Sequence, residues 1–146
     1  MNIRILTAKL RDVDAPLLAS LIPEDTKQLS GQMIELDELL GGGVSKTLSS
    51  EAFKGKLYSS FLLYTANKIK ADYLLLTGLG PREELSSESF RIASGEAALR
   101  ASNIGARSYA LYLDSSSMEF GGQKVVESVV VGAELALYTY TRYKSQ

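Results

Sequence analysis

The sequence predicts an α/β fold with three layers, in which a mixed, mostly parallel sheet is flanked by helices. An apolar run at residues 72–77, a helical pattern at 86–103 and a second apolar run at 108–113 form a strand–helix–strand unit. Such a right-handed crossover predicts two parallel neighbouring strands. Apolar stretches at 58–65 and 72–77, separated by a polar turn, predict a hairpin. A chain of 146 residues is expected to form one domain, residues 1–146.

The first half of the chain is expected to supply three further strands and a weak helix. Residues 2–7 alternate between apolar and polar side chains, which is the pattern of a strand. Residues 15–22 form a continuous apolar run between two prolines; a buried strand and a short helix both fit, and the strand is preferred. Residues 32–36 are predicted as a short strand, and residues 45–55 have modest helical character.

The second half contains the two clearest helical patterns. In residues 86–103, Ser86 or Ser87 can cap the N-terminus, and Glu88 lies in the first turn, where the helix dipole favours negative charge. Apolar residues recur there at spacings of three and four, and most are small, so this helix can lie close to a sheet. A final helix is predicted after residue 122. Its apolar face would consist of Val126, Val129, Ala133, Leu137 and Tyr140.

Composition excludes several classes of function. With 16 Lys and Arg against 17 Asp and Glu, the net charge of -1 gives no general electrostatic reason to bind nucleic acid or an anionic membrane. The chain contains no His and no Cys, which excludes imidazole or thiolate catalysis and zinc sites of the usual Cys/His type. No segment has the apolar stretch of a signal peptide or membrane span, so we expect a cytoplasmic protein.

Two glycine-rich segments are candidates for anion binding. Gly41, Gly42, Gly43 and Val44 lie between a predicted strand and a predicted helix, and three glycines leave the backbone free to wrap a phosphate. A flexible connection between the two elements is the alternative interpretation. Residues 78–80 also lie between a strand and a helix. There a following proline removes one amide and the third glycine of a dinucleotide fingerprint is missing, so these glycines are interpreted as structural.

Two further patterns have structural interpretations. Aromatic and cationic side chains alternate near the C-terminus, a pattern that can stack on single-stranded nucleic acid. Because no second basic patch accompanies them, these residues are interpreted as the end of a packed helix. They are Tyr138, Tyr140, Arg142, Tyr143 and Lys144. Acidic residues are spread over turns and outer faces, with no pair placed as a two-metal site requires, so the residues alone predict no catalytic group and no metal ligand.

Several segments, taken in order and spacing, resemble the N-terminal domain of the leucyl aminopeptidase (cytosol aminopeptidase) family. The last of them, residues 132–145, is similar to the helix with which that domain ends, before the linker to the catalytic domain. The segments that carry the resemblance are Phe53-Lys54-Gly55-Lys56, Leu75-Leu76-Thr77-Gly78-Leu79-Gly80, Glu84-Leu85, Ser89-Phe90-Arg91, Gly95-Glu96-Ala97-Ala98 and residues 132–145.

The resemblance implies a cytoplasmic, typically hexameric enzyme that uses two zinc or manganese ions to release N-terminal residues from peptides. The family's metal ligands and catalytic Lys and Arg lie in its C-terminal domain, in segments that do not occur here, so no catalytic residue or metal ligand is carried over. The implied role is that of the non-catalytic half, which contributes to assembly and shapes access to the active site. Its partners would be the catalytic domain of the same polypeptide and sister subunits.

An alternative follows from the same resemblance, because this half of the family is structurally related to macro domains. Residues 39–44 resemble the glycine-rich phosphate loop of macro domains. A stand-alone macro-like module would bind a nucleotide or another phosphate ligand at Gly41 to Gly43. Asp37 and Glu38 stand where macro domains have an asparagine-rich stretch, and their charges would repel a diphosphate.

Overall fold

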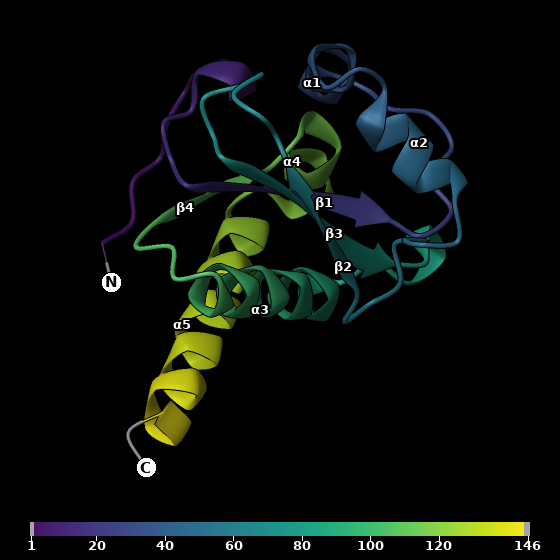
Figure 1. Ribbon diagram of the computed structural model, residues 1–146. Helices are drawn as coiled ribbons and strands as arrows, with labels where there is room; N and C mark the ends of the chain where they lie inside the picture. Colours follow the sequence, from purple (N-terminus) through teal and green to yellow (C-terminus); the bar gives the residue numbers. More distant parts are fainter. Residues whose placement is uncertain (1, 145–146) are drawn as a thin grey trace.

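A four-stranded mixed sheet with the order β2-β3-β1-β4 forms the centre of the molecule (Figure 1). In this computed structural model, which describes residues 2–144 and the side chains of residues 2–137, β1 (Leu17–Pro23) runs parallel to both of its neighbours. These are β3 (Tyr73–Gly80) and β4 (Tyr109–Tyr112). The edge strand β2 (Ser60–Tyr64) pairs antiparallel with β3, which confirms the predicted hairpin.

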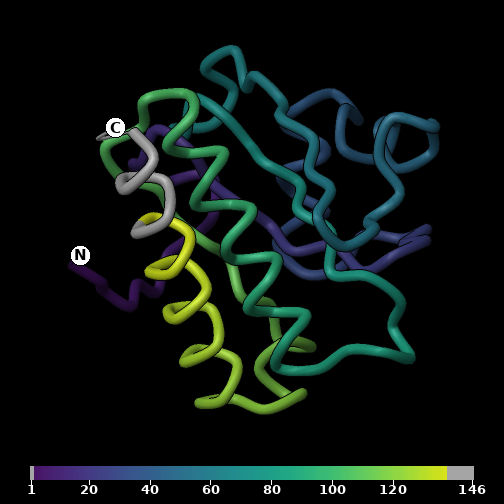
Figure 2. The backbone as a smooth tube through the Cα atoms, turned by 90° about the horizontal axis from the view of Figure 1, so that it is seen from below, coloured from purple at the N-terminus to yellow at the C-terminus, as the bar shows by residue number. Residues whose placement is uncertain are grey.

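Helices cover both faces of the sheet, which confirms the predicted three-layer α/β class (Figures 1 and 2). One face packs against two short helices, α1 and α2, and the other against α3, on which α5 lies. The helical elements are η1 (Leu10–Asp12), α1 (Gln32–Leu39), α2 (Gly43–Ser49), η2 (Arg82–Glu84), α3 (Ser87–Asn103), α4 (Ser115–Gly121) and α5 (Gln123–Lys144).

Strand β1 is buried on both faces, as its unbroken apolar sequence predicts. Leu18 and Ile22 point into a cluster with Met33 and Leu36 of α1 and with Val44 of α2. The intervening residues of β1 point to the opposite face, because successive strand side chains alternate. There they pack against the small side chains of α3. The strand extends through Pro23, one residue beyond the predicted run.

Helix α3 begins as predicted, with Ser86 as its N-cap. The Ser86 hydroxyl accepts a hydrogen bond from the Ser89 N–H at 3.4 Å, and the Ser89 hydroxyl accepts one from the Ser86 N–H at 3.2 Å. This reciprocal pair satisfies two donors that a helix start otherwise leaves free. Phe90 and three alanines of the predicted face are buried, whereas its last predicted member, Ile104, follows the helix and is 38% exposed.

Two predictions for the first half of the chain are wrong. Residues 2–9 form neither helix nor strand, and Ile3 and Ile5 are exposed. Alternation predicts a strand only where a neighbouring strand pairs with it, and none does so in the described residues. Residues 32–36, predicted as a strand, lie in α1. Met33 and Leu36 are both buried because a spacing of three places them on one side of a helix.

Three further differences concern the helices and the strand order. The helix predicted over residues 45–55 is α2, which begins two residues earlier and ends at Ser49. The strands on either side of α3 are parallel, but they are not neighbours, because β1 lies between them. The helix α4 was not predicted. The predicted final helix is α5, although the side chains of its aromatic and cationic end, residues 138–144, lie outside those described.

Candidate functional site

The place where this topology favours a ligand is the carboxyl end of β1 and β3. The chain leaves β1 toward α1 on one face of the sheet and leaves β3 toward α3 on the other face. In open α/β sheets, such a divergence opens a crevice outside the carboxyl ends of the strands, and ligands bind there. Two structures meet at this edge: residues 54–57 and a cavity.

The backbone of residues 54–57 lies directly against the ends of both strands. A Cβ added at Gly78 would come within 1.9 Å of the Lys56 carbonyl oxygen, and one at Gly55 within 2.7 Å of the Pro23 carbonyl oxygen. The Gly80 N–H donates to the Gly55 carbonyl at 2.9 Å. Both glycines of the 78–80 segment are therefore needed for close backbone packing, and their amides bond within the chain, which confirms the structural interpretation of this segment.

The glycine loop joins α1 to α2, and Gly41 and Gly42 have φ of 66° and 81°. Its glycine amides all donate to backbone carbonyls of the same turn: Gly41 to Glu38, Gly42 to Asp37 and Gly43 to Leu40. Glycine is required at positions 41 and 42 because the left-handed backbone there would strain other residues. Crowding is not the reason, since an added Cβ at Gly41 or Gly42 would meet no atom within 4 Å. The preceding element is the helix α1, not the predicted strand.

A carboxylate of this chain occupies the start of α2. The Asp37 carboxylate accepts hydrogen bonds from the Val44 N–H at 2.9 Å and the Ser45 N–H at 3.0 Å. It also accepts one from the Ser45 hydroxyl at 2.5 Å. The N–H groups of Gly41, Gly42, Gly43 and Val44 therefore all donate within the chain, and a phosphate would have to displace Asp37 to reach Val44. Phosphate binding at these four residues stays a prediction.

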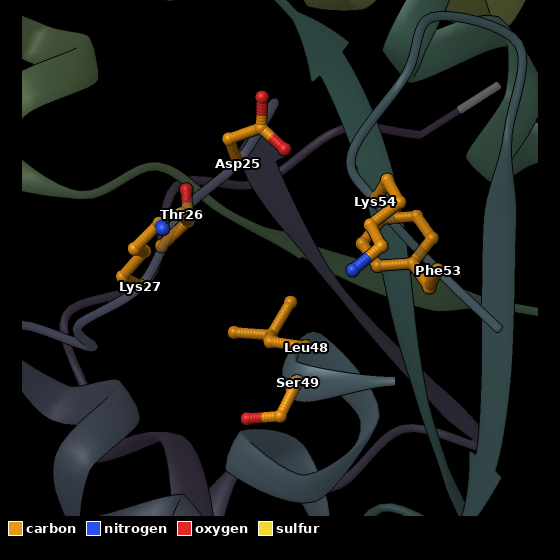
Figure 3. Close-up of a pocket in the computed structure, with 7 residues that line it drawn as sticks. All are labelled: Asp25, Thr26, Lys27, Leu48, Ser49, Phe53 and Lys54. Atoms are coloured by element: carbon orange, nitrogen blue, oxygen red, sulfur yellow. The ribbon is translucent and has the colours of Figure 1, made fainter. Parts of the chain in front are cut away.

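A cavity of about 300 Å³ opens beside this edge of the sheet (Figure 3). Its walls come from the loop after β1, from the end of α2 and from the segment that follows α2. Two ammonium groups, one carboxylate and two hydroxyls surround an apolar floor. The lining residues are Asp25, Thr26, Lys27, Leu48, Ser49, Phe53 and Lys54. Residue-based reasoning did not identify this cavity, since its residues come from three separate segments and form no motif.

Hydrogen bonds hold the walls of this cavity together. The Asp25 N–H donates to the Lys54 carbonyl at 3.0 Å, and the Thr26 hydroxyl donates to the Pro23 carbonyl at 2.7 Å. Arg82 donates from Nη2 to the Thr26 hydroxyl at 3.2 Å. Asp25 has a φ of 58°, a left-handed conformation that is uncommon for residues other than glycine. The loop after β1 is thus attached both to η2 and to the segment after α2.

Metal ligands do not gather in the part of the chain that the structure describes. Among those residues, no group of three or more acidic side chains lies close enough to hold a metal ion. None of the described helices is both long and apolar enough to cross a membrane.

The fold is that of the macro domains. The macrodomain of Mycobacterium tuberculosis DarG superposes with a TM-score of 0.69 over 88% of this chain and 88% of that chain. The sequence identity is only 9%, so this likeness concerns the fold alone. A point mutant of tomato leucine aminopeptidase superposes with a TM-score of 0.64 at 26% identity, over 87% of this chain and 26% of that chain.

Sequence comparison gives the family. Residues 21–146 match the model of the cytosol aminopeptidase family, N-terminal domain, so the chain belongs to that family. It is 27% identical over 145 residues to a probable cytosol aminopeptidase of Alkaliphilus oremlandii, which covers 99% of this chain and 29% of that protein. It is 37% identical over 111 residues to one of Geotalea uraniireducens, over 76% of this chain and 22% of that protein. The chain thus spans less than a third of the length of these relatives.

Proposed function

We propose that this chain acts as the non-catalytic N-terminal domain of a cytoplasmic metallo-aminopeptidase, where it contributes to assembly and shapes access to the active site. The single observation that carries the proposal is the match of residues 21–146 to the N-terminal domain of that family. The partners would be a catalytic domain in the same polypeptide and sister subunits of a hexamer. The catalytic domain would hold two zinc or manganese ions and release N-terminal residues from peptides.

The carboxyl edge of the sheet supports a structural role. Residues 54–57 pack backbone against backbone on the ends of β1 and β3, and Asp37 occupies the start of α2. The chain itself therefore covers the ends of β1 and β3 and occupies the start of α2, where a phosphate group could otherwise bind. Such filling favours a role in assembly over a role as a nucleotide-binding module.

Exposed apolar side chains support a role in assembly. Met118 and Phe120 of α4 are 42% and 47% exposed, and Val131 of α5 is 44% exposed. Single exposed apolar residues are common, whereas a contiguous apolar patch marks a surface that packs against another domain or subunit. These residues are the first positions to change when assembly is tested.

The test replaces the N-terminal segment of the Geotalea uraniireducens relative by this chain. We expect the chimera to reach the oligomeric mass of that relative and to hydrolyse a leucine chromogenic amide with added Mn²⁺. The Met118→Asp and Val131→Asp variants of the chimera should lower the assembled fraction in analytical ultracentrifugation, whereas an exposed polar control, Lys124→Asp, should not. The 146-residue chain alone should give no turnover with Mn²⁺ or Zn²⁺.

Two results would contradict the proposal. Metal-dependent hydrolysis by the pure 146-residue chain would assign chemistry to it. A chimera that is monomeric but otherwise folded and metal-loaded would show that the segment does not support assembly.

A further inference from the structure

The cavity beside the carboxyl end of β1 has the features of a small-molecule site. Its volume of about 300 Å³ is at the lower end for ligand pockets, and its lining combines polar and charged groups with the two apolar side chains of Leu48 and Phe53. It lies where α/β topology places ligands, on the α1–α2 side of the sheet. A ligand of few atoms is therefore indicated, much smaller than a dinucleotide.

Charges of both signs stand on two segments that hydrogen-bond to each other. In Figure 3, Asp25 lies on the loop after β1 and Lys54 on the segment after α2. The Asp25 N–H donates to the Lys54 carbonyl at 3.0 Å. Neither the Asp25 carboxylate nor the Lys27 ammonium makes a hydrogen bond or ion pair with another described residue. Lys54 pairs with Glu51 at 3.7 Å, but the Glu51 side chain is 96% exposed, so a ligand carboxylate can replace it at small cost.

The floor between these charges is apolar. Phe53 is buried at 3% exposure, and Leu48 is half-buried at the end of α2. Figure 3 shows Leu48 between Lys27 on one side and Phe53 on the other, with Ser49 below it. A ligand that carries an ammonium and a carboxylate on one carbon, with an apolar side chain, matches all three surfaces at once. An inorganic anion would leave Asp25 and the apolar floor without a counterpart.

We propose that this cavity binds a free α-amino acid with an apolar side chain. Its ammonium contacts Asp25, its carboxylate contacts Lys54, and its side chain packs on Leu48 and Phe53. The binding itself does not depend on the proposed function. Within the proposed function, such an amino acid would be a product that the attached catalytic domain releases; this part of the proposal rests on the proposed function.

The test is a titration of the ¹⁵N-labelled 146-residue chain with L-leucine, in which NMR monitors the amide shifts. We expect saturable shifts at the amides of residues 25–27, 48–49 and 53–54, with a dissociation constant on the order of 1 mM. Glycine should bind about threefold or more weakly, because it lacks the apolar side chain. Leucinamide and 4-methylpentanoate each lack one charge, and each should also bind about threefold more weakly than leucine.

Charge variants make the assignment specific. Asp25→Asn keeps a residue that tolerates the left-handed backbone at φ 58°, so the loop is retained. It should weaken leucine binding about threefold while leaving 4-methylpentanoate binding unchanged. Lys54→Gln should weaken leucine and 4-methylpentanoate binding but not leucinamide binding. Lys46→Gln, on α2 but outside the cavity lining, is the matched control and should change nothing.

Three outcomes would overturn the proposal. The first is the absence of saturable shifts up to about 20 mM leucine in a chain with native spectral dispersion. The second is equal effects of the Asp25→Asn and Lys46→Gln variants. The third is tighter binding of inorganic phosphate than of leucine at the same residues, which would assign the cavity to an anion. None of these outcomes bears on whether the chimera assembles, so the two proposals fail separately.

Discussion

At the scale of single residues, Asp37 decides how the glycine loop is used. A carboxylate that accepts two backbone N–H groups and one hydroxyl at the start of α2 does what a bound phosphate would do at a helix start. It does so as part of the chain and without a ligand. The neighbouring Glu38 makes no such contact with α2, which gives a matched position for comparison.

Replacing Asp37 by Ala should therefore lower the free energy of unfolding by about 1 kcal/mol, because the amides of Val44 and Ser45 lose their acceptor. Urea denaturation measures this, and Glu38→Ala should change the stability by less than half as much.

Calorimetry with ADP-ribose on the wild-type chain and on Asp37→Ala tests the alternative function. Tight binding to the wild-type chain that Asp37→Ala alters would indicate a phosphate site at Gly41 to Gly43, against the structural role proposed for this loop.

The burial of Tyr109 leads to a prediction about how the free energy of unfolding depends on pH. It is half-buried on β4 against the α3 face, and burial raises the pKa of its hydroxyl above the usual value of about 10. The unfolded chain then loses this proton at a lower pH than the folded chain. The stability contribution is complete below the ordinary tyrosine pKa and is lost as the pH rises through the folded value.

Unfolding free energies between pH 9 and pH 11 should therefore fall more steeply in the wild-type chain than in Tyr109→Phe. Tyr112, whose pKa is raised by burial and by Asp114, contributes in the same direction, so the Tyr109→Phe variant keeps part of the slope. Identical slopes for the two proteins would contradict the account of Tyr109.

At the scale of elements, the contact between α3 and α5 depends on small residues. A Cβ added at Gly132 would come within 2.1 Å of the Arg91 carbonyl oxygen, so the two backbones touch there. The Ser94 hydroxyl donates to the Val129 carbonyl at 2.5 Å across the same contact. Close approach of this kind is available only where no side chain intervenes.

Gly132→Ala should therefore cost about 1–3 kcal/mol of unfolding free energy, because α5 must move away from α3. Gly95→Ala is the control across the same interface. Its added Cβ would meet its nearest neighbour at 3.4 Å, and alanine improves helix propensity, so its stability should stay the same or rise slightly. Thermal unfolding of both variants measures the difference. A smaller loss for Gly132→Ala than for Gly95→Ala would contradict this packing.

At the scale of the whole molecule, the ordered fold begins at η1. Leu10 is buried at 6% exposure, and its N–H donates to the Gln32 side chain at 2.8 Å. The residues before it carry exposed apolar side chains, with Ile5 at 86% exposure. The three core clusters draw only on residues from Leu10 onward.

The free energy of unfolding of a chain that starts at Lys9 should accordingly lie within about 0.5 kcal/mol of that of the 146-residue chain. Urea denaturation with equal midpoints and equal slopes for both proteins would confirm it. A loss above about 1 kcal/mol would show instead that residues 2–8 pair with the sheet, as their alternating sequence first suggested.

The sequence by itself determined the α/β class, the central strands, the cap of α3 and the family. Long apolar runs, regular spacing and a serine cap are local signals, and local signals can be read along a chain. Tertiary structure alone decided that residues 32–36 are helical, that residues 2–7 have no strand partner and that β1 lies between β3 and β4. It also brought Asp25, Leu48 and Lys54 around one cavity and placed the Asp37 carboxylate on the start of α2. These features depend on contacts between segments that are distant in the sequence, so the pattern of any single segment does not predict them.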